Sequence, residues 1–357
     1  MSEELPRPRE WLAGAKPYRT QSQAADVRLQ SNEWAEPTAL GRYLSAADLE
    51  ETTLNRYPDI AARRLRAILA EEWAVAPEQV IVGNGSNEVL LYTFLVFGGP
   101  DRTLLVFTPT YTMYARLGRM TGMRVHEERV GVPYALRADT VRDAVDRVRP
   151  DLVCFSSPNN PTGDLIDDDA IRAALACQRA LVLVDEAYAD FADHTLLPLI
   201  ASHPNLVIAR TFSKARASAG LRLGALVADR RIAETYDAAR LPYNVGALTQ
   251  LVAERVAADH AGLTERVVCV KAERARVADA LRTLPDIETF PSRANFLLFR
   301  HRTMPAGAVH ASLLARGILV RDVSSWTDAG QSLRVTIGTP AENDRFLGAL
   351  RAAVEVR

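Results

Sequence analysis

Short apolar runs alternate along the chain with longer segments whose apolar residues recur at helical spacing. Between 60 and 73, for example, Leu65, Leu69 and Trp73 fall on one face of a helix. The short runs are rich in Val, Leu and Ile and have the length of buried strands. The pattern predicts helices at 60–73, 84–97, 111–120, 138–148 and 167–177, and strands at 79–82, 103–107, 124–130, 151–155, 181–184, 206–211 and 223–227.

Beyond residue 248 the chain becomes mainly helical. A long helix is predicted at 264–284, ending before Pro285 because a proline cannot continue a helix. Alternating strands and helices favour an α/β fold with a mostly parallel central sheet flanked by helices, and the last part favours a smaller α+β domain. That last part contains predicted strands at 296–299, 318–320 and 333–337 and helices at 308–315 and 343–354. We expect an N-terminal segment at 1–50, a large domain at 51–270 and a small domain at 271–357.

Composition and charge narrow the possible partners. The 357 residues include 43 Lys and Arg against 44 Asp and Glu, and a net charge of −1 argues against nucleic-acid and membrane partners. The widely spaced Cys154, Cys177 and Cys269 indicate neither a metal site nor a disulfide framework. The most apolar stretch, 89–99, is too short to span a bilayer, and the acidic, proline-containing start is unlike a signal peptide. We therefore expect a cytoplasmic protein, in a reducing compartment.

Polar motifs follow several predicted strands, where ligands of α/β proteins usually bind. Lys214 lies just beyond strand 206–211, in the sequence Thr211-Phe-Ser-Lys, and Arg222 follows shortly after. A lysine amine can form a Schiff base with an aldehyde, and the hydroxyls of Thr211 and Ser213 with the Arg222 guanidinium suit a phosphate. Taken alone, these residues are better explained as a surface lysine and an arginine paired with a carboxylate.

Two further motifs end in turns after strands. Asp185 closes the apolar run 181–184, and a buried carboxylate needs a partner, such as the pyridinium nitrogen of a cofactor. A capping role is the simpler alternative. A metal-binding role of the kind found in nucleoside triphosphatases is not supported, because the sequence has no G-x-x-x-x-G-K-[ST] motif. Asn160, in Ser157-Pro-Asn-Asn-Pro-Thr-Gly, fits a tight turn, or an amide that donates to a phenolic oxygen.

A glycine-rich segment precedes the predicted helix 84–97. Free backbone N–H groups at a helix start bind anions, and glycines let the backbone approach a ligand closely. The segment Gly83-Asn-Gly-Ser-Asn-Glu88 is not a dinucleotide motif, because Glu88 stands where the third glycine would be. An ordinary helix cap by Ser86 or Asn87 explains the same residues.

The order of these motifs is more specific than any one of them. From Pro17-Tyr18 to Arg334 the chain resembles the fold-type I pyridoxal-phosphate enzymes of the aspartate aminotransferase superfamily. It is most similar to the histidinol-phosphate aminotransferases. The resemblance implies an aspartate aminotransferase-like fold, pyridoxal 5'-phosphate as the cofactor, no metal, and a homodimer. It also implies that segment 1–50 contributes to the small domain and the substrate pocket.

The resemblance also implies a role for each matching residue. Lys214 would carry the cofactor and move the proton, Asp185 would pair with the pyridine nitrogen, and Tyr111 would stack on the ring. The other cofactor contacts would be Asn160 and Tyr188 at the phenolic oxygen; Ser86, Asn87, Ser213, Arg222 and Thr211 at the phosphate; and Tyr57, reaching the phosphate of the neighbouring subunit. Tyr18, Asn32, Arg321 and Arg334 would line the substrate pocket, with Arg334 binding a carboxylate.

Several of these roles have simpler alternatives. Tyr18 and Tyr57 could be tyrosines that pack beside prolines, and Arg321 could be an exposed charge at a strand end. An arginine within an apolar strand needs an anion, so Arg334 is harder to explain in that way.

The implied reaction moves an amino group between histidinol phosphate and 2-oxoglutarate or glutamate. An aromatic amino-acid aminotransferase and, less well supported, a threonine-phosphate-type decarboxylase remain alternatives, because they share most of these residues. The chain departs from the family pattern at Trp34, at Arg216, where an aromatic residue is common, and at Ala225, where a tyrosine is common. We expect Trp34 and Arg216 to touch the pocket region and affect the choice of substrate.

Overall fold

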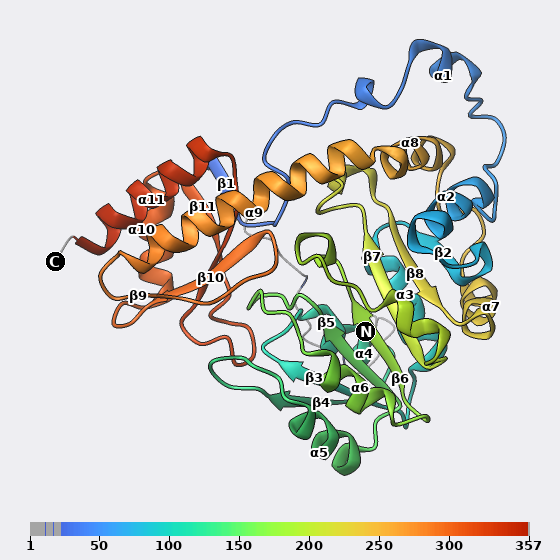
Figure 1. Ribbon diagram of the computed structural model, residues 1–357, viewed down its shortest axis with the longest axis horizontal. Helices are drawn as coiled ribbons and strands as arrows, with labels where there is room; N and C mark the ends of the chain where they lie inside the picture. The colour runs from blue at the N-terminus through green and yellow to red at the C-terminus, as the bar shows by residue number, and fades with distance from the viewer. Residues whose placement is uncertain (1–10, 12–16, 18–22, 356–357) are drawn as a thin grey trace, which may run out of the picture.

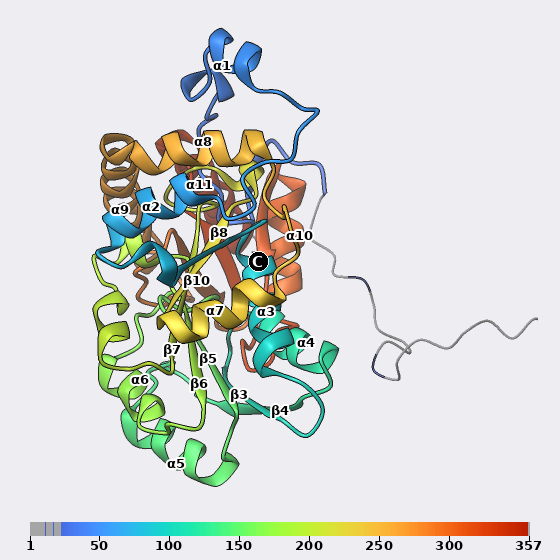
Figure 2. The same cartoon turned by 90° about the vertical axis from the view of Figure 1, so that its right-hand side faces the viewer.

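The computed structural model describes residues 11, 17 and 23–355, which form two β-sheets. Helix α9 (His260–Arg282) runs from beside the large sheet to the small sheet, as Figures 1 and 2 show. Contacts from two of its arginines fix this helix. Arg266 Nε donates to the Ala215 carbonyl on one side (2.9 Å), and Arg274 Nη1 donates to the Ala294 carbonyl on the other (2.7 Å).

The large sheet has seven strands in the order β2-β8-β7-β6-β5-β3-β4. Strand β8 alone runs opposite to the other six strands, which confirms the predicted mostly parallel sheet. The strands are β2 (Val80–Gly83), β3 (Thr103–Thr108), β4 (Arg124–Arg129), β5 (Leu152–Ser156), β6 (Leu181–Asp185), β7 (Leu206–Thr211) and β8 (Gly224–Ala228). Each begins and ends within one residue of its predicted position.

Helices cover both faces of the large sheet, so its central strands are apolar on both sides. In β6, Val182 and Val184 face one hydrophobic cluster while Leu181 and Leu183 face another. The first cluster lies under α5 (Ala138–Val148) and α6 (Asp168–Leu175), and the second under α3 (Ser86–Phe97), α4 (Met113–Met120) and α7 (Arg230–Ala239). Helices α2 (Arg63–Trp73) and α8 (Ala247–Ala258) cover β2 and β8.

The small sheet has the order β1-β11-β12-β10-β9. Its strands are β1 (Val27–Leu29), β9 (Ile287–Thr289), β10 (Phe296–His301), β11 (Ile318–Asp322) and β12 (Leu333–Thr336), and α9, α10 (Ala306–Ala315) and α11 (Pro340–Glu355) pack on it. Strand β1 pairs in parallel with β11, so the N-terminal segment enters this sheet. Among the described residues, no helix is long and apolar enough to cross a membrane.

Some elements differ from the sequence prediction. Strands β1 and β9, with three residues each, and helices α1 (Ala46–Glu51) and α7 were not predicted. Helix α2 begins at Arg63 instead of 60 because the Asp59 carboxylate accepts hydrogen bonds from the Ala61 and Arg63 amides. Helix α9 begins four residues earlier than predicted because Asp259 caps it at the Gly262 amide.

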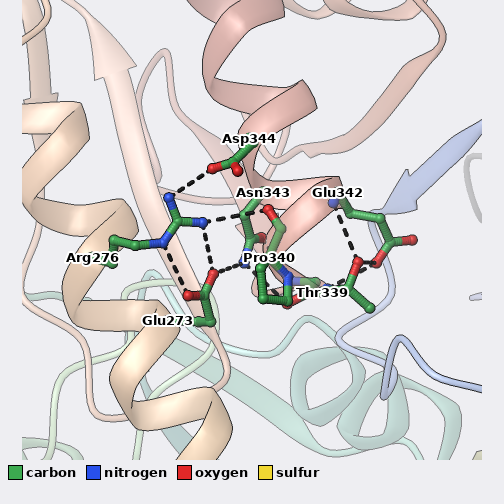
Figure 3. Close-up of polar contacts among 8 residues, drawn as sticks. Glu273, Arg276, Thr339, Pro340, Glu342, Asn343 and Asp344 are labelled. Atoms are coloured by element: carbon green, nitrogen blue, oxygen red, sulfur yellow. Dashed lines mark hydrogen bonds and ion pairs between the residues drawn. The ribbon is translucent and has the colours of Figure 1, made fainter.

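A polar network fixes the start of α11 against α9 (Figure 3). Thr339 and Glu342 bond to each other's backbone amides and so form a capping box. The Asn343 side chain, in a residue only 1% exposed, donates to Glu273 (2.8 Å) and to the Gly338 carbonyl (3.0 Å). Arg276 bridges Glu273 and Asp344.

We expect Asn343→Ala to lower the free energy of unfolding by about 2 kcal/mol, because it leaves buried polar groups without partners. Chemical denaturation would measure this change. Asp344→Ala is the matched control: its carboxylate is mostly exposed, so its loss should cost less than about 1 kcal/mol. Equal effects of the two substitutions would contradict the role given to Asn343.

Candidate active site

A cavity of about 380 Å³ opens at the carboxyl ends of the large-sheet strands and is shared with the small sheet. Thirteen of the fifteen residues singled out from the sequence line it: Asn32, Ser86, Asn87, Tyr111, Asn160, Asp185, Tyr188, Thr211, Ser213, Lys214, Arg222, Arg321 and Arg334. Tyr57 does not line it, and Tyr18 lies outside the described residues. Residues from both sheets and from segment 30–33 therefore meet at one place.

Lys214 follows β7 and extends its amine into the cavity, where Nζ donates to the Ser31 carbonyl (2.8 Å). Burial and, to a smaller extent, the positive charges of Arg334 and Arg222 lower the pKa of this amine to about 8. Glu33 and Asp185 act in the opposite direction. The result is an amine that is partly unprotonated near neutral pH, as a nucleophile or a base requires.

Asp185 lies at the end of β6 and is almost completely buried. Burial raises the pKa of this carboxyl to about 6, although hydrogen bonds from the Tyr114 hydroxyl (2.9 Å) and the Ala187 amide (3.1 Å) lower it. At neutral pH the group is therefore mostly ionised. A buried anion held in this way is suited to a cationic ring nitrogen.

The start of α3 and Arg222 form an anion-binding cradle at one end of the cavity. Gly85 has a φ of +85°, and a Cβ there would lie 2.3 Å from Arg222 Nη2. A Cβ at Gly224 would lie 2.4 Å from the Ser86 amide nitrogen. Only glycines therefore let the guanidinium and the first amides of the helix converge, beside the hydroxyls of Thr211 and Ser213.

Two arginines lie at the other end of the cavity, on neighbouring antiparallel strands. Arg321 of β11 and Arg334 of β12 are directly opposed in the sheet register. Arg334 is buried, donates to the Asn160 amide oxygen, and donates to the Gln30 carbonyl (2.7 Å). Like charges in such a pair are destabilising unless an anion lies between them, so this end of the cavity suits a second anionic group.

The remaining cavity residues form a hydrogen-bonded layer between these two ends. Asn32 has a φ of +56° and donates from Nδ2 to the Tyr188 hydroxyl (2.9 Å). The Tyr111 hydroxyl donates to the Asn87 side chain (3.1 Å), and the Tyr111 ring contacts Tyr114 edge-on. These contacts tie segment 30–33 to Tyr188, and they tie Tyr111 to the start of α3 and to α4.

Sequence reasoning missed several residues that the fold brings here. Tyr114, one helical turn beyond Tyr111, could have been found from that spacing. Ser31, Glu33 and Trp326 also line the cavity, and no local motif marks them. The expectation that Arg216 touches the pocket was wrong: its guanidinium is buried against Glu72 and the carbonyls at the end of α8.

The donor set fits pyridoxal 5'-phosphate. The cradle at Gly85 matches a phosphate, the Asp185 carboxylate matches a pyridinium nitrogen, and the Lys214 amine matches an aldehyde. No cluster of three or more potential metal ligands occurs among residues 11, 17 and 23–355.

Comparison with known proteins agrees with this geometry. Residues 24–350 match the family model for aminotransferase class I and II. Histidinol-phosphate aminotransferase 1 of Carboxydothermus hydrogenoformans is 36% identical over 96% of this chain and 97% of its own length. The histidinol-phosphate aminotransferase of Frankia casuarinae is 39% identical over 96% of this chain and 89% of its own length.

One solved structure shares the fold almost completely. The histidinol-phosphate aminotransferase of Sinorhizobium meliloti, in complex with pyridoxal-5'-phosphate, has a TM-score of 0.85 at 22% identity, covering 99% of this chain and 98% of that one. The predicted resemblance, aminotransferase chemistry and cofactor are thereby confirmed. The chain belongs to the class I and II aminotransferases.

Proposed function

We propose that this aminotransferase exchanges an amino group between histidinol phosphate and 2-oxoglutarate or glutamate. The opposed arginines Arg321 and Arg334 carry the proposal, since they form an anion site separate from the cradle at Gly85. The cofactor phosphate would occupy the cradle. The substrate phosphate, or the side-chain carboxylate of glutamate, would bind between the two arginines. The two relatives at 36% and 39% identity bear the same activity in their names.

The chain's residues divide the work of the reaction. When bound, pyridoxal phosphate supplies an electron sink for the carbanion that forms at the substrate α-carbon. Asp185 would keep the ring nitrogen protonated, and Asn160 and Tyr188 would bond to the phenolic oxygen. The Lys214 amine, which is partly unprotonated near neutral pH, would act as the base that takes the proton from the substrate α-carbon and as the acid that returns it.

An aromatic amino-acid aminotransferase is the second candidate, because Trp326 and Tyr111 give the cavity an aromatic side. Such an enzyme would use Arg334 for the substrate carboxylate. The third candidate, a threonine-phosphate-type decarboxylase, would release carbon dioxide, so an assay for this product distinguishes it from both aminotransferases.

We also propose that the enzyme is a homodimer in which Tyr57 completes the partner's cofactor site. Segment 36–60 extends past α8 (Figures 1 and 2) and is held there by Tyr43, which donates to Asp259 (2.8 Å), and by the ion pair of Asp48 with Arg255. Nevertheless, Leu54 is 82% exposed and Tyr57 is 79% exposed. Further exposed apolar side chains on this segment and beyond α7 are Leu40, Leu49, Leu241 and Tyr243. Apolar exposure of this kind is typical of a protein interface.

The domain boundaries and the location belong to the same proposal. Segment 1–50 would contribute to the small domain and the substrate pocket, residues 51–270 would form the cofactor-binding domain, and residues 271–357 the small domain. The free cysteines Cys154, Cys177 and Cys269 support a reducing, cytoplasmic location.

The first test is the absorption spectrum of the purified protein reconstituted with pyridoxal phosphate. We expect a cofactor band that Lys214→Ala abolishes together with turnover. Histidinol phosphate should bleach the band at lower concentration than phenylalanine does, and 2-oxoglutarate should restore it. Stronger bleaching by phenylalanine would replace the proposed substrate with an aromatic amino acid, and no band at all would contradict the cofactor assignment.

The lowered pKa of Lys214 predicts how cofactor capture depends on pH. The cofactor-free protein should react with pyridoxal phosphate faster as the pH rises, with a midpoint near pH 8, because only the unprotonated amine attacks the aldehyde. Stopped-flow absorbance would measure these rates. Arg334→Ala removes a cation that lowers this pKa, so its midpoint should move to higher pH. A wild-type midpoint above pH 10 would show that the amine is unperturbed.

The dimer predicts that two variants, one with weak cofactor binding and one without the catalytic lysine, complement each other. Tyr57→Phe should remain dimeric but bind the cofactor about 10- to 100-fold more weakly, because it loses a hydrogen bond to a charged phosphate. Mixed dimers of Tyr57→Phe and Lys214→Ala contain one intact site, so unfolding and refolding the mixture should restore activity at limiting cofactor. Leu54→Glu should yield monomers in light scattering. Failure of complementation in verified mixed dimers would place Tyr57 outside the partner's site.

A further inference from the structure

A second cavity adjoins the active-site cavity, and two aromatic residues separate them. The neighbouring cavity has a volume of about 130 Å³ and lies between the end of β3, the start of α4 and residues 325–327. Tyr111 and Trp326 line both cavities. Trp326 is only 8% exposed, and its ring belongs to an apolar cluster on which Tyr111 packs. The two rings therefore form a partition at the substrate end of the active site.

The loop that presents Trp326 connects β11 with β12 and is fixed to the large sheet. In Figure 1 the chain beyond β11 reaches the large sheet beside β3, where Asp328 accepts a hydrogen bond from the Thr108 hydroxyl (2.6 Å). Asp328 also pairs with Arg129 (3.4 Å). Within the loop, the Trp326 amide donates to the Val323 carbonyl (2.9 Å). A side chain held by contacts on both sheets can limit the size of a ligand, because it cannot easily move aside.

The same ring lies beside the proposed substrate anion site. The Arg334 guanidinium carbon is 6.0 Å from the Trp326 ring centroid and 5.2 Å from that of Phe296. A substrate whose anionic group binds Arg334 would therefore extend its side chain along Trp326. The flat face of the indole suits a planar ring, and the cavity behind the indole is closed to that ring while Trp326 remains in place.

We propose that Trp326 is the specificity-determining residue that restricts amino donors to those with a small planar side chain, such as imidazole. The proposal rests on the proposed function for the amino donor, but it concerns the size limit at the end of the cavity. Removing the indole would join the two cavities and admit a bicyclic side chain. Pocket contacts of this size change selectivity by one to two orders of magnitude.

The test compares donors that differ in ring size but not in charge. For wild type and Trp326→Ala, kcat/KM is measured for phenylalanine and tryptophan with 2-oxoglutarate as acceptor, and in parallel for histidinol phosphate. The ratio of tryptophan to phenylalanine should rise at least tenfold in Trp326→Ala and by an intermediate factor in Trp326→Phe. This ratio does not depend on whether histidinol phosphate is the preferred donor, so the two proposals fail separately.

Binding without turnover gives a second readout. Titration calorimetry with 3-phenylpropanoate and 3-(indol-3-yl)propanoate, which lack an amino group, should show the same shift in relative affinity. Trp73→Ala is the matched control: Trp73 ends α2, packs against Arg210 and lies outside both cavities. It should lower stability and leave both ratios unchanged.

Two results would overturn the proposal. One is an unchanged tryptophan-to-phenylalanine ratio, in rate and in binding, in folded Trp326→Ala and Trp326→Phe. The other is an equal rise in KM for all donors and for 2-oxoglutarate, which would show that the indole acts only by positioning Arg334.

Discussion

The desolvation of one carboxylate and one amine in a shared cavity is the constraint on which this structure depends. Neither Asp185 nor Lys214 is stable away from water without compensation. Tyr114 of α4 and the Ala187 amide stabilise the carboxylate, and the Ser31 carbonyl accepts from the amine. The same burial sets the reactivity of both groups, because it raises the pKa of the Asp185 carboxyl and lowers the pKa of the Lys214 amine. Burial of apolar side chains on both faces of the large sheet offsets the free-energy cost of desolvating these two groups.

Charge at the two ends of the cavity follows the same logic. Arg222 converges with helix amides at one end, and Arg321 opposes Arg334 at the other. Each arrangement concentrates positive charge that a bound anion would neutralise. In the proposed function, the two sheets would set the distance between the substrate and cofactor anions, and the reacting carbon would lie between these anions, within reach of Lys214.

The sequence predicted the large sheet well because its strands are buried on both faces and read as continuous apolar runs, as in 181–184 and 206–211. The cavity residues with local motifs were also found, since Lys214, Asp185 and Asn160 each follow such a strand. Strand β1 was not predicted, because three residues are too few to show a periodic pattern and its partner strand β11 is distant in the chain. The place of Trp326 in the cavity and the ion pair of Arg216 with Glu72 were not predicted either, because only tertiary packing defines their surroundings.

The pairing of β1 with β11 has a consequence for how the protein forms in the cell. Gln30, just beyond β1, accepts from Arg334, 304 positions later in the chain. Residues 30–33 can reach their native places only after β11 and β12 have left the ribosome. The large sheet, complete by residue 228, can fold earlier, during synthesis. Catalytic competence is thus the last property the nascent chain acquires, and it comes from closing a loop that spans most of the polypeptide.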